Sequence, residues 1–112
     1  MAQQKIVINR SARQLVLYDG DHILGRYPIA VGKNATPTPT GNYSVVTKYM
    51  NPGGVFGSRW IGLSIPHYGI HGTSAPSSIG TQASLGCIRM HNRDVEAVYN
   101  QVGVGTPVII RP

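Results

Sequence analysis

The fold is decided near the N-terminus, by Lys5-Ile6-Val7-Ile8-Asn9 and then Gln14-Leu15-Val16-Leu17-Tyr18-Asp19-Gly20. Branched aliphatic residues and a period of two are typical of short, half-buried β-strands. Asp19-Gly20 predicts a hairpin turn, because glycine accepts the positive φ that such turns require. The chain then returns as a third strand from His22 to Val31, in which Gly25 marks a candidate bulge.

The same pattern continues along the chain, with turn residues between the segments. Further strands are expected at Asn42 to Tyr49, Trp60 to Ser64, Tyr68 to His71 and Pro107 to Arg111. One helix is expected from Arg93 to Gln101. Asn92 is a suitable N-cap for it, and an apolar face follows at Val95, Val98, Tyr99 and Val102. The sequence therefore predicts a mostly β sandwich or barrel with one short helix.

Composition agrees with one small β domain. The chain has 112 residues, 14 of them glycine and 8 proline, and only 12% are charged. That charged share is far below the roughly 25% of ordinary domains and excludes a coiled coil. A hydrophobic share of 41% suffices for a core. We expect a single domain over residues 1–112, without a transmembrane segment, and no signal peptide is apparent at the N-terminus.

The formal net charge of +6 favours anionic partners. The basic residues are scattered singly, without a dense run or an RNA-binding signature, so no nucleic-acid partner is expected. An acidic polymer such as a bacterial wall remains compatible with this charge, as does a plain solvated surface.

Cys87 is the candidate nucleophile. Gly86 before it permits close backbone approach and an exposed amide, while Ser84 and Arg89 make the neighbourhood polar and positive. A nearby cation favours the thiolate, and His71 could take the thiol proton from within hydrogen-bond reach. A lone cysteine is more often a small buried residue, and four histidines offer such a pair by chance. The residues alone leave both interpretations open.

A metal site is not expected. His67 and His71 have the spacing of two ligands on a helix, but Pro66, Gly69 and Gly72 disfavour a helix there. On a strand the two side chains would stand about 13 Å apart, too far for one ion.

Taken together, these residues resemble a known active-site signature. His71-Gly72-Thr73 followed by Ser84-Leu85-Gly86-Cys87-Ile88-Arg89-Met90 resembles that of the L,D-transpeptidase catalytic domain, the YkuD family. The likeness runs from Lys5 to Arg111, with further segments that resemble compact Bacillus-type members. These are Tyr27-Pro28-Ile29-Ala30-Val31-Gly32, Thr38-Pro39-Thr40-Gly41, Asn51-Pro52-Gly53-Gly54, Tyr68-Gly69-Ile70 and Met90-His91-Asn92. The resemblance implies a β-sandwich-like catalytic fold and a peptidoglycan cross-linking enzyme.

The resemblance also implies roles for individual residues. Cys87 would be the nucleophile and His71 its base, with the backbone carbonyl of Gly72 holding the imidazole in its working tautomer. Backbone amides of Leu85, Gly86 and Cys87 would form the oxyanion hole. Many members carry histidine where this chain has Leu85, so only the amide is expected to matter there.

Substrate contacts are implied for Arg89 and Ser84. Arg89 would steer a substrate carboxylate or support the site, and Ser84 would hydrogen-bond the stem peptide. Tyr68, three residues before His71, is a further candidate for substrate binding along the donor groove, with ordinary packing as the alternative. No metal or organic cofactor is expected. The partners would be peptidoglycan stem peptides, a tetrapeptide donor and a diamino-acid acceptor. We expect a monomer that acts outside the membrane, at the cell wall or in a spore coat.

The implied reaction is a cysteine acyl transfer that forms 3→3 cross-links and releases D-alanine. Two alternatives stay open, namely an L,D-carboxypeptidase that uses water as the acceptor and a non-catalytic wall-binding module. Residues Met50 to Trp60 are rich in glycine and could form either a mobile flap over the site or an ordinary hairpin loop. Trp60 is expected in the core.

Overall fold

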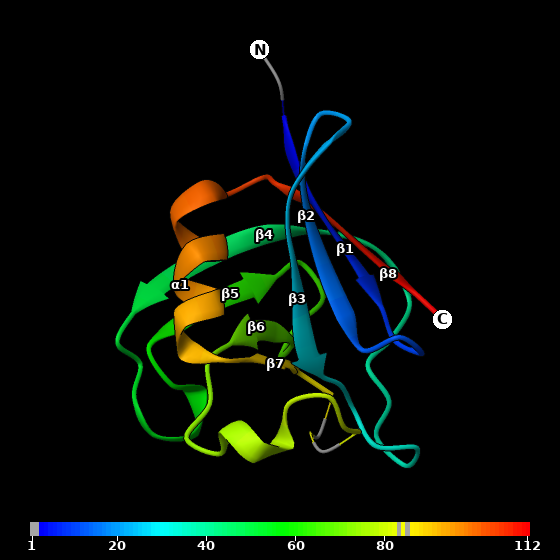
Figure 1. Cartoon of the computed structure of the whole chain (residues 1–112), viewed down its shortest axis with the longest axis vertical. Helices are drawn as coiled ribbons and strands as arrows, with labels where there is room; N and C mark the ends of the chain where they lie inside the picture. The colour runs from blue at the N-terminus through cyan, green and yellow to red at the C-terminus, as the bar shows by residue number, and fades with distance from the viewer. Residues whose placement is uncertain (1–2, 83, 85) are drawn as a thin grey trace.

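Eight β-strands and one α-helix build the fold in a computed structural model that describes residues 3–82, 84 and 86–112 (Figure 1). The strands are β1 (Gln4–Asn9), β2 (Gln14–Asp19), β3 (His22–Ala30), β4 (Gly41–Met50), β5 (Arg59–Leu63), β6 (Gly69–His71), β7 (Ile88–Met90) and β8 (Pro107–Arg111). The helix is α1 (Asn92–Gln101), and two short 3-10 helices are η1 (Gly54–Phe56) and η2 (Pro76–Ser78). The expected mostly β fold with one helix near the C-terminus is confirmed.

The strands pair in the closed order β1-β2-β3-β7-β6-β5-β4-β8. Two sheets make up this ring, and both contain β3 and β4. Residues 22–28 of β3 pair with β2, and its last residues, Ile29 and Ala30, pair with β7. Among the described strands, β1 pairs with β8 and β6 pairs with β7 in parallel, and the other pairs are antiparallel. The sandwich and the barrel are therefore two descriptions of one arrangement, in which long strands pass from sheet to sheet.

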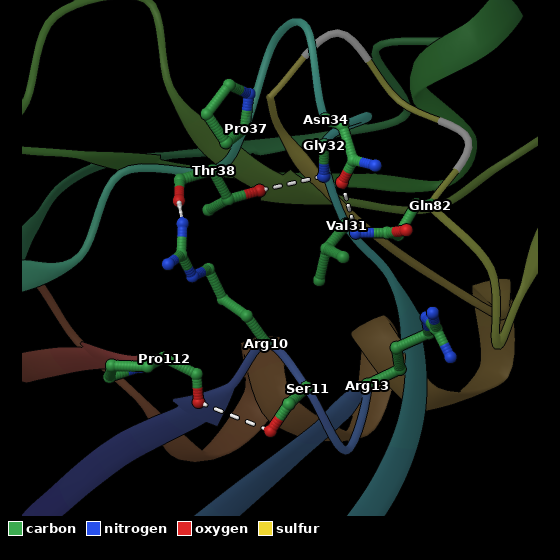
Figure 2. Close-up of a pocket in the computed structure, with 10 residues that line it drawn as sticks. All are labelled: Arg10, Ser11, Arg13, Val31, Gly32, Asn34, Pro37, Thr38, Gln82 and Pro112. Atoms are coloured by element: carbon green, nitrogen blue, oxygen red, sulfur yellow. Dashed lines mark hydrogen bonds between the residues drawn. The ribbon is translucent and has the colours of Figure 1, made fainter.

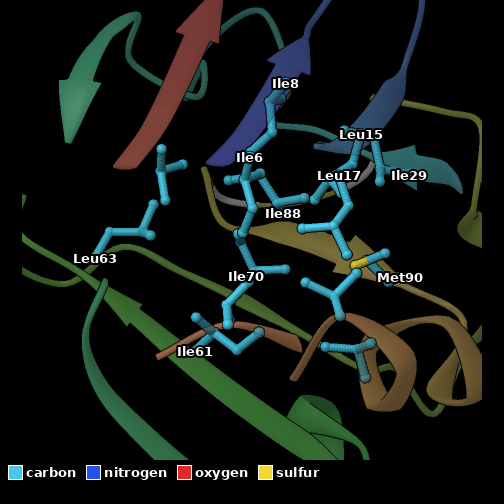
Figure 3. Close-up of a cluster of buried hydrophobic side chains, with 14 of the residues drawn as sticks. Ile6, Ile8, Leu15, Leu17, Ile29, Ile61, Leu63, Ile70, Ile88 and Met90 are labelled. Carbon is cyan, nitrogen blue, oxygen red and sulfur yellow. The ribbon is translucent and has the colours of Figure 1, made fainter. Parts of the chain in front are cut away.

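The core lies between the two sheets, as Figure 3 shows. The apolar residues that alternate along the strands form this core. In β2, for example, Leu15 is 0% exposed and Leu17 is 1% exposed. Ile70 of β6 is fully buried beside strands on either side. The helix adds Val95 and Val98, as its apolar face predicted, and packs on β5 and β6. This core holds β6 and β7, the two short strands that carry the candidate chemistry.

The expected strands are all present, and each of their ends lies within one residue of the predicted position. The bulge is confirmed beside Gly25, because Leu17 pairs with Gly25 while Tyr18 pairs with Ile23, which leaves Leu24 over. The strand β7 was missed, since three residues are too few to display an alternation. No helix among the described residues is long and apolar enough to cross a membrane.

The prediction that Asn92 caps the helix is wrong. His91 is the N-cap, and no side chain makes the capping hydrogen bond. Asn92 instead lies in the first turn of α1, and its side-chain amide faces two loops. Its Oδ1 accepts from the backbone N–H of Ser58 at 3.1 Å and of Thr73 at 3.2 Å, and its Nδ2 donates to the Thr73 carbonyl. Three segments distant in sequence are joined there.

Replacing Ile70 tests the contribution of the core. Ile70→Ala should lower the free energy of unfolding by about 2–5 kcal/mol, because it removes buried methyl groups and leaves a cavity between β5 and β7. Urea unfolding followed by circular dichroism measures this. Ile23→Ala is the matched control, since Ile23 is 42% exposed and its loss should change the unfolding free energy by at most about 0.5 kcal/mol. Equal losses for the two variants would contradict the assignment of the core.

Candidate active site

Cys87 stands just before β7 and faces groups from the segment that leads into β6. Its Sγ lies 3.7 Å from the His67 carbonyl oxygen, and the backbone of Gly69 also hydrogen-bonds it. Burial raises the pKa of the Cys87 thiol above its ordinary value. The Gly69 hydrogen bond and the charge of Arg89 lower that pKa, but by less. Arg89 thus acts in the expected direction and favours the thiolate, but burial has the larger effect on the pKa of Cys87.

His71 ends β6 and is 3% exposed. Burial lowers its pKa most; the Gly72 carbonyl works against this, and the charge of Arg89 lowers the pKa further. Its Nδ1 lies 2.5 Å from the Gly72 carbonyl oxygen. Because a carbonyl only accepts, we assign the proton to Nδ1, which leaves the lone pair on Nε2. At neutral pH the ring is therefore an uncharged base.

Strand register places His71 between two other side chains of the site. It pairs with Trp60 of β5 on one side and with Arg89 of β7 on the other. The Trp60 ring stacks on the imidazole with centroids 5.6 Å apart, and Phe56 meets the imidazole edge-on at 5.1 Å. The prediction that Trp60 belongs to the core is wrong. Its strand was placed correctly, but the ring covers His71 and remains partly exposed.

A cavity of about 520 Å³ brings the expected residues together. Cys87, His71 and Arg89 line it, together with Ser84, Tyr68 and His67. Val55 and Phe56 add an apolar wall from the stretch between β4 and β5, where η1 lies over the site. Among the described residues, no three His, Cys, Asp or Glu side chains gather closely enough to hold a metal ion.

The hydroxyl of Ser84 makes two hydrogen bonds that hold the segment before Cys87. Ser84 Oγ donates to the Cys87 carbonyl at 2.6 Å and accepts from the Gly86 N–H at 3.0 Å. Ser84 is 2% exposed. Its hydroxyl is thus engaged within the segment, where the sequence had suggested a contact with the stem peptide. The Gly86 amide, expected to be exposed, is buried and bound to Ser84. Leu85 lies outside the described residues.

Gly86 is required for the shape of this segment. Its φ is +128°, a conformation that other residues rarely adopt, and a Cβ there would collide with the Tyr68 ring. The close approach expected of Gly86 is therefore present, and the neighbour is Tyr68.

Thr38 is a positioning residue that sequence reasoning missed. It is 1% exposed; its Oγ1 donates to the Gly86 carbonyl at 2.7 Å and accepts from the Gly32 N–H at 2.9 Å. Figure 2 shows the second of these bonds. Thr38 lies in the proline-rich stretch from Thr36 to Gly41. A threonine between two prolines gave no signal of a partner 48 residues away.

The orienting carbonyl is itself held in place. Gly72 donates its N–H to the Arg59 carbonyl at 3.2 Å. A side chain at Gly72 would collide with Asn92 Oδ1, and one at Gly57 would collide with the same atom. Asn92 therefore fits tightly against the backbone at Gly57 and at Gly72, the residue after His71. This packing helps to keep the Gly72 carbonyl directed toward Nδ1.

Comparison with known proteins gives a consistent result. The L,D-transpeptidase catalytic domain family, YkuD, matches residues 3–110. The chain is 52% identical over 108 residues to the YkuD protein of Bacillus licheniformis and 49% identical over 105 residues to that of Bacillus subtilis. These alignments cover 96% and 94% of this chain, which spans 66% and 64% of the length of the two relatives.

Solved structures share the fold at lower identity. An L,D-transpeptidase from Mycobacterium smegmatis superposes with a TM-score of 0.88 at 19% identity, over 99% of this chain and 59% of that one. The catalytic domain of the Enterococcus faecium enzyme gives 0.83 at 23% identity, over 99% and 98% of the two chains. With its matched sequence, its fold and its Cys87–His71 cavity, the chain belongs to the YkuD family of L,D-transpeptidase catalytic domains.

Proposed function

We propose that this chain is a peptidoglycan L,D-transpeptidase that forms 3→3 cross-links between stem peptides through an acyl-enzyme on Cys87. Its family acts on the peptidoglycan of the cell wall. One observation carries the proposal for this chain. A thiol, an uncharged imidazole with Nδ1 bound to a carbonyl, and a guanidinium line one cavity.

In the first step, Cys87 Sγ attacks the carbonyl carbon of the third stem residue. His71 Nε2 takes the thiol proton as the S–C bond forms, so the raised pKa of the thiol is overcome only when a substrate is in place. The C–N bond to the terminal D-alanine then breaks. His71 returns the proton to the departing amine, and a thioester remains on Cys87.

The negative charge on the carbonyl oxygen needs nearby donors. We propose the backbone amides of Leu85, Gly86 and Cys87 for this role, of which Gly86 would have to exchange its Ser84 partner for the substrate. Each donor in such a site contributes about 3 kcal/mol to the transition state. Arg89 lies beside the base and would bind the substrate carboxylate, which also offsets its charge near His71.

In the second step, the side-chain amine of an acceptor stem attacks the thioester. His71 accepts a proton from that amine and gives it to Sγ as the S–C bond breaks, which restores the starting thiol. The apolar wall of Val55 and Phe56 limits water around the thioester, and Tyr68 lines the donor side. The proposal includes a tetrapeptide donor, a diamino-acid acceptor and a monomeric catalytic domain over residues 1–112, acting outside the membrane at the cell wall or in a spore coat.

Products from a purified disaccharide-tetrapeptide test the reaction. Mass spectrometry should find a dimer that has lost one D-alanine. Cys87→Ala should abolish it, and His71→Ala should slow the first step by about 10²–10⁴-fold, the usual contribution of a general base. Arg93→Gln is a matched control, because this exposed arginine lies outside the cavity. Its turnover should equal that of the wild type.

Other products would change the conclusion. A tripeptide monomer alone would mean that water is the acceptor, which is the L,D-carboxypeptidase alternative. If the tetrapeptide stays unchanged, a second probe shows whether Cys87 can be acylated at all. One solved L,D-transpeptidase with this fold holds imipenem, and this chain should likewise gain the mass of one imipenem on Cys87. Failure of both reactions would favour the non-catalytic wall-binding alternative.

The pH dependence of alkylation tests the resting state of Cys87. The chain has one cysteine, so iodoacetamide reports on it alone, and only thiolate reacts. A raised thiol pKa means less thiolate at every pH below it. The alkylation rate should therefore still be rising above about pH 8.5, the ordinary value for cysteine. The same chain unfolded in urea is the control and should show the lower midpoint. A plateau below about pH 7 would instead indicate a thiolate–imidazolium pair.

A further inference from the structure

The proposed reaction puts a positive charge on His71 that no acidic side chain offsets. His71 takes a proton from Cys87 in the first step and from the acceptor amine in the second, so an imidazolium forms twice. Among the described residues that line the cavity, none is Asp or Glu. Burial and the charge of Arg89 both oppose the imidazolium, and the carbonyl of Gly72 favours it. A further group that favours the cation would speed both steps.

Trp60 presents the face of its indole to this imidazole. The two rings are nearly parallel, at an interplanar angle of 15°, and their centroids lie 5.6 Å apart. Phe56 meets the same imidazole edge-on, at an interplanar angle of 89°. The electron-rich face of an aromatic ring attracts a cation within about 6 Å of its centroid, and indole does so most strongly. The stacked indole is thus placed to favour the charged form of the base.

The backbone beneath the indole leaves room for this stack. Gly62 of β5 and Gly69 of β6 are directly paired. A Cβ at Gly69 would lie 2.6 Å from two carbons of the indole, and one at Gly62 would lie 3.0 Å from its Nε1. Neither glycine has a positive φ, so the ring above them, and not the backbone conformation, requires glycine there. The indole lies over this pair, and the pairing of Trp60 with His71 aligns it with the imidazole.

We propose that Trp60 stabilises the imidazolium of His71 by a cation–π interaction during both proton transfers. This role rests on the proposed transpeptidase reaction. The Gly72 carbonyl holds a proton on Nδ1, whereas the indole face favours the charge that arises when Nε2 accepts a second proton. Trp60 acts through His71 and is therefore a positioning residue.

An uncharged aromatic face suits this cavity better than a carboxylate. A carboxylate beside His71 would form an ion pair with Arg89, which the pairing of β6 with β7 sets next to the imidazole. It would also favour an imidazole that is already protonated at rest, and a protonated ring cannot accept the thiol proton. The attraction of an indole face is weaker. The ring therefore remains an uncharged base until the reaction supplies the proton.

Fluorination of the indole tests the interaction without changing the other charged groups around it. These groups are Cys87 and Arg89 at β7, His67 and Tyr68 before β6, Arg59 of β5, and Glu96 of α1, which accepts from Ser58 Oγ. Fluorine withdraws electrons from the face of an aromatic ring and changes the size of the ring little. The chain has one tryptophan, so a fluorinated analogue supplied during expression enters at Trp60 alone.

The measurement is the pKa of His71 in chains whose indole carries no, one, two or three fluorine atoms. Ring-proton NMR of the Cys87→Ala chain gives this pKa without thiol titration and without turnover, and His71→Gln assigns the signal. The pKa should fall with each fluorine, by about one pH unit at three, which equals about 1.4 kcal/mol. His22, exposed at the start of β3, is the internal control, and its pKa should stay constant.

Two substitutions separate the aromatic face from simple shielding. Trp60→Phe keeps an aromatic face for the imidazole, and Trp60→Leu does not. Both variants admit water to a similar extent, which raises the pKa of His71 because burial lowers it. The pKa should nevertheless be higher in Trp60→Phe than in Trp60→Leu, by about half a pH unit. Equal values in the two variants would show that Trp60 only shields the base, and would overturn the proposal.

The rate of acylation connects the stack with the reaction. In the chain that retains Cys87, imipenem acylation should slow in parallel with the fall in pKa, by up to about tenfold at three fluorine atoms. A His71 pKa that does not respond to fluorine overturns the proposal, as does an acylation rate that stays constant while the pKa falls. If the pKa falls but the chain with natural tryptophan is never acylated, the stack is supported and the proposed reaction is contradicted.

Discussion

The parallel pairing of β6 with β7 is the constraint on which the site depends. It sets His71 beside Arg89, two residues after Cys87, while the antiparallel pairing of β6 with β5 sets Trp60 on the other side of the imidazole. A slip of one residue in either pairing would turn these side chains to the opposite face. Strands of three residues cannot fix their own register. The buried Ile70 and Ile88, which are also partners, fix it for them.

Local patterns were enough for most of the fold. Alternating aliphatic residues located the long strands, the helix face at Val95 and Val98, and the bulge near Gly25. The pairing of Cys87 with His71 has a different basis. Spacing alone left it undecided against a buried cysteine, and the family resemblance supplied it. Strand β7 escaped notice because its three residues carry too little pattern.

The errors share one physical origin, which is contact between residues far apart in sequence. Asn92 has the composition of an N-cap, but its amide is used by Ser58 and Thr73. Trp60 has the size of a core residue, but the space beside it is occupied by His71. Arg89 does favour the thiolate of Cys87, yet burial, which the sequence does not display, has the larger effect on that pKa. For Asn92 and Trp60, a partner far away in the sequence determines the role of the side chain.

Closure of the strand order has a consequence for how the molecule meets others. Every described strand has a neighbour on both sides in the closed order. Residues 22–28 of β3 nevertheless pair only with β2, because β3 meets β7 at Ile29 and Ala30 alone. That free edge is short and carries a bulge beside Gly25, the charged Arg26 and Pro28, features that disfavour the addition of a strand from another chain. Closure and these edge features together protect the sheet from templating self-association.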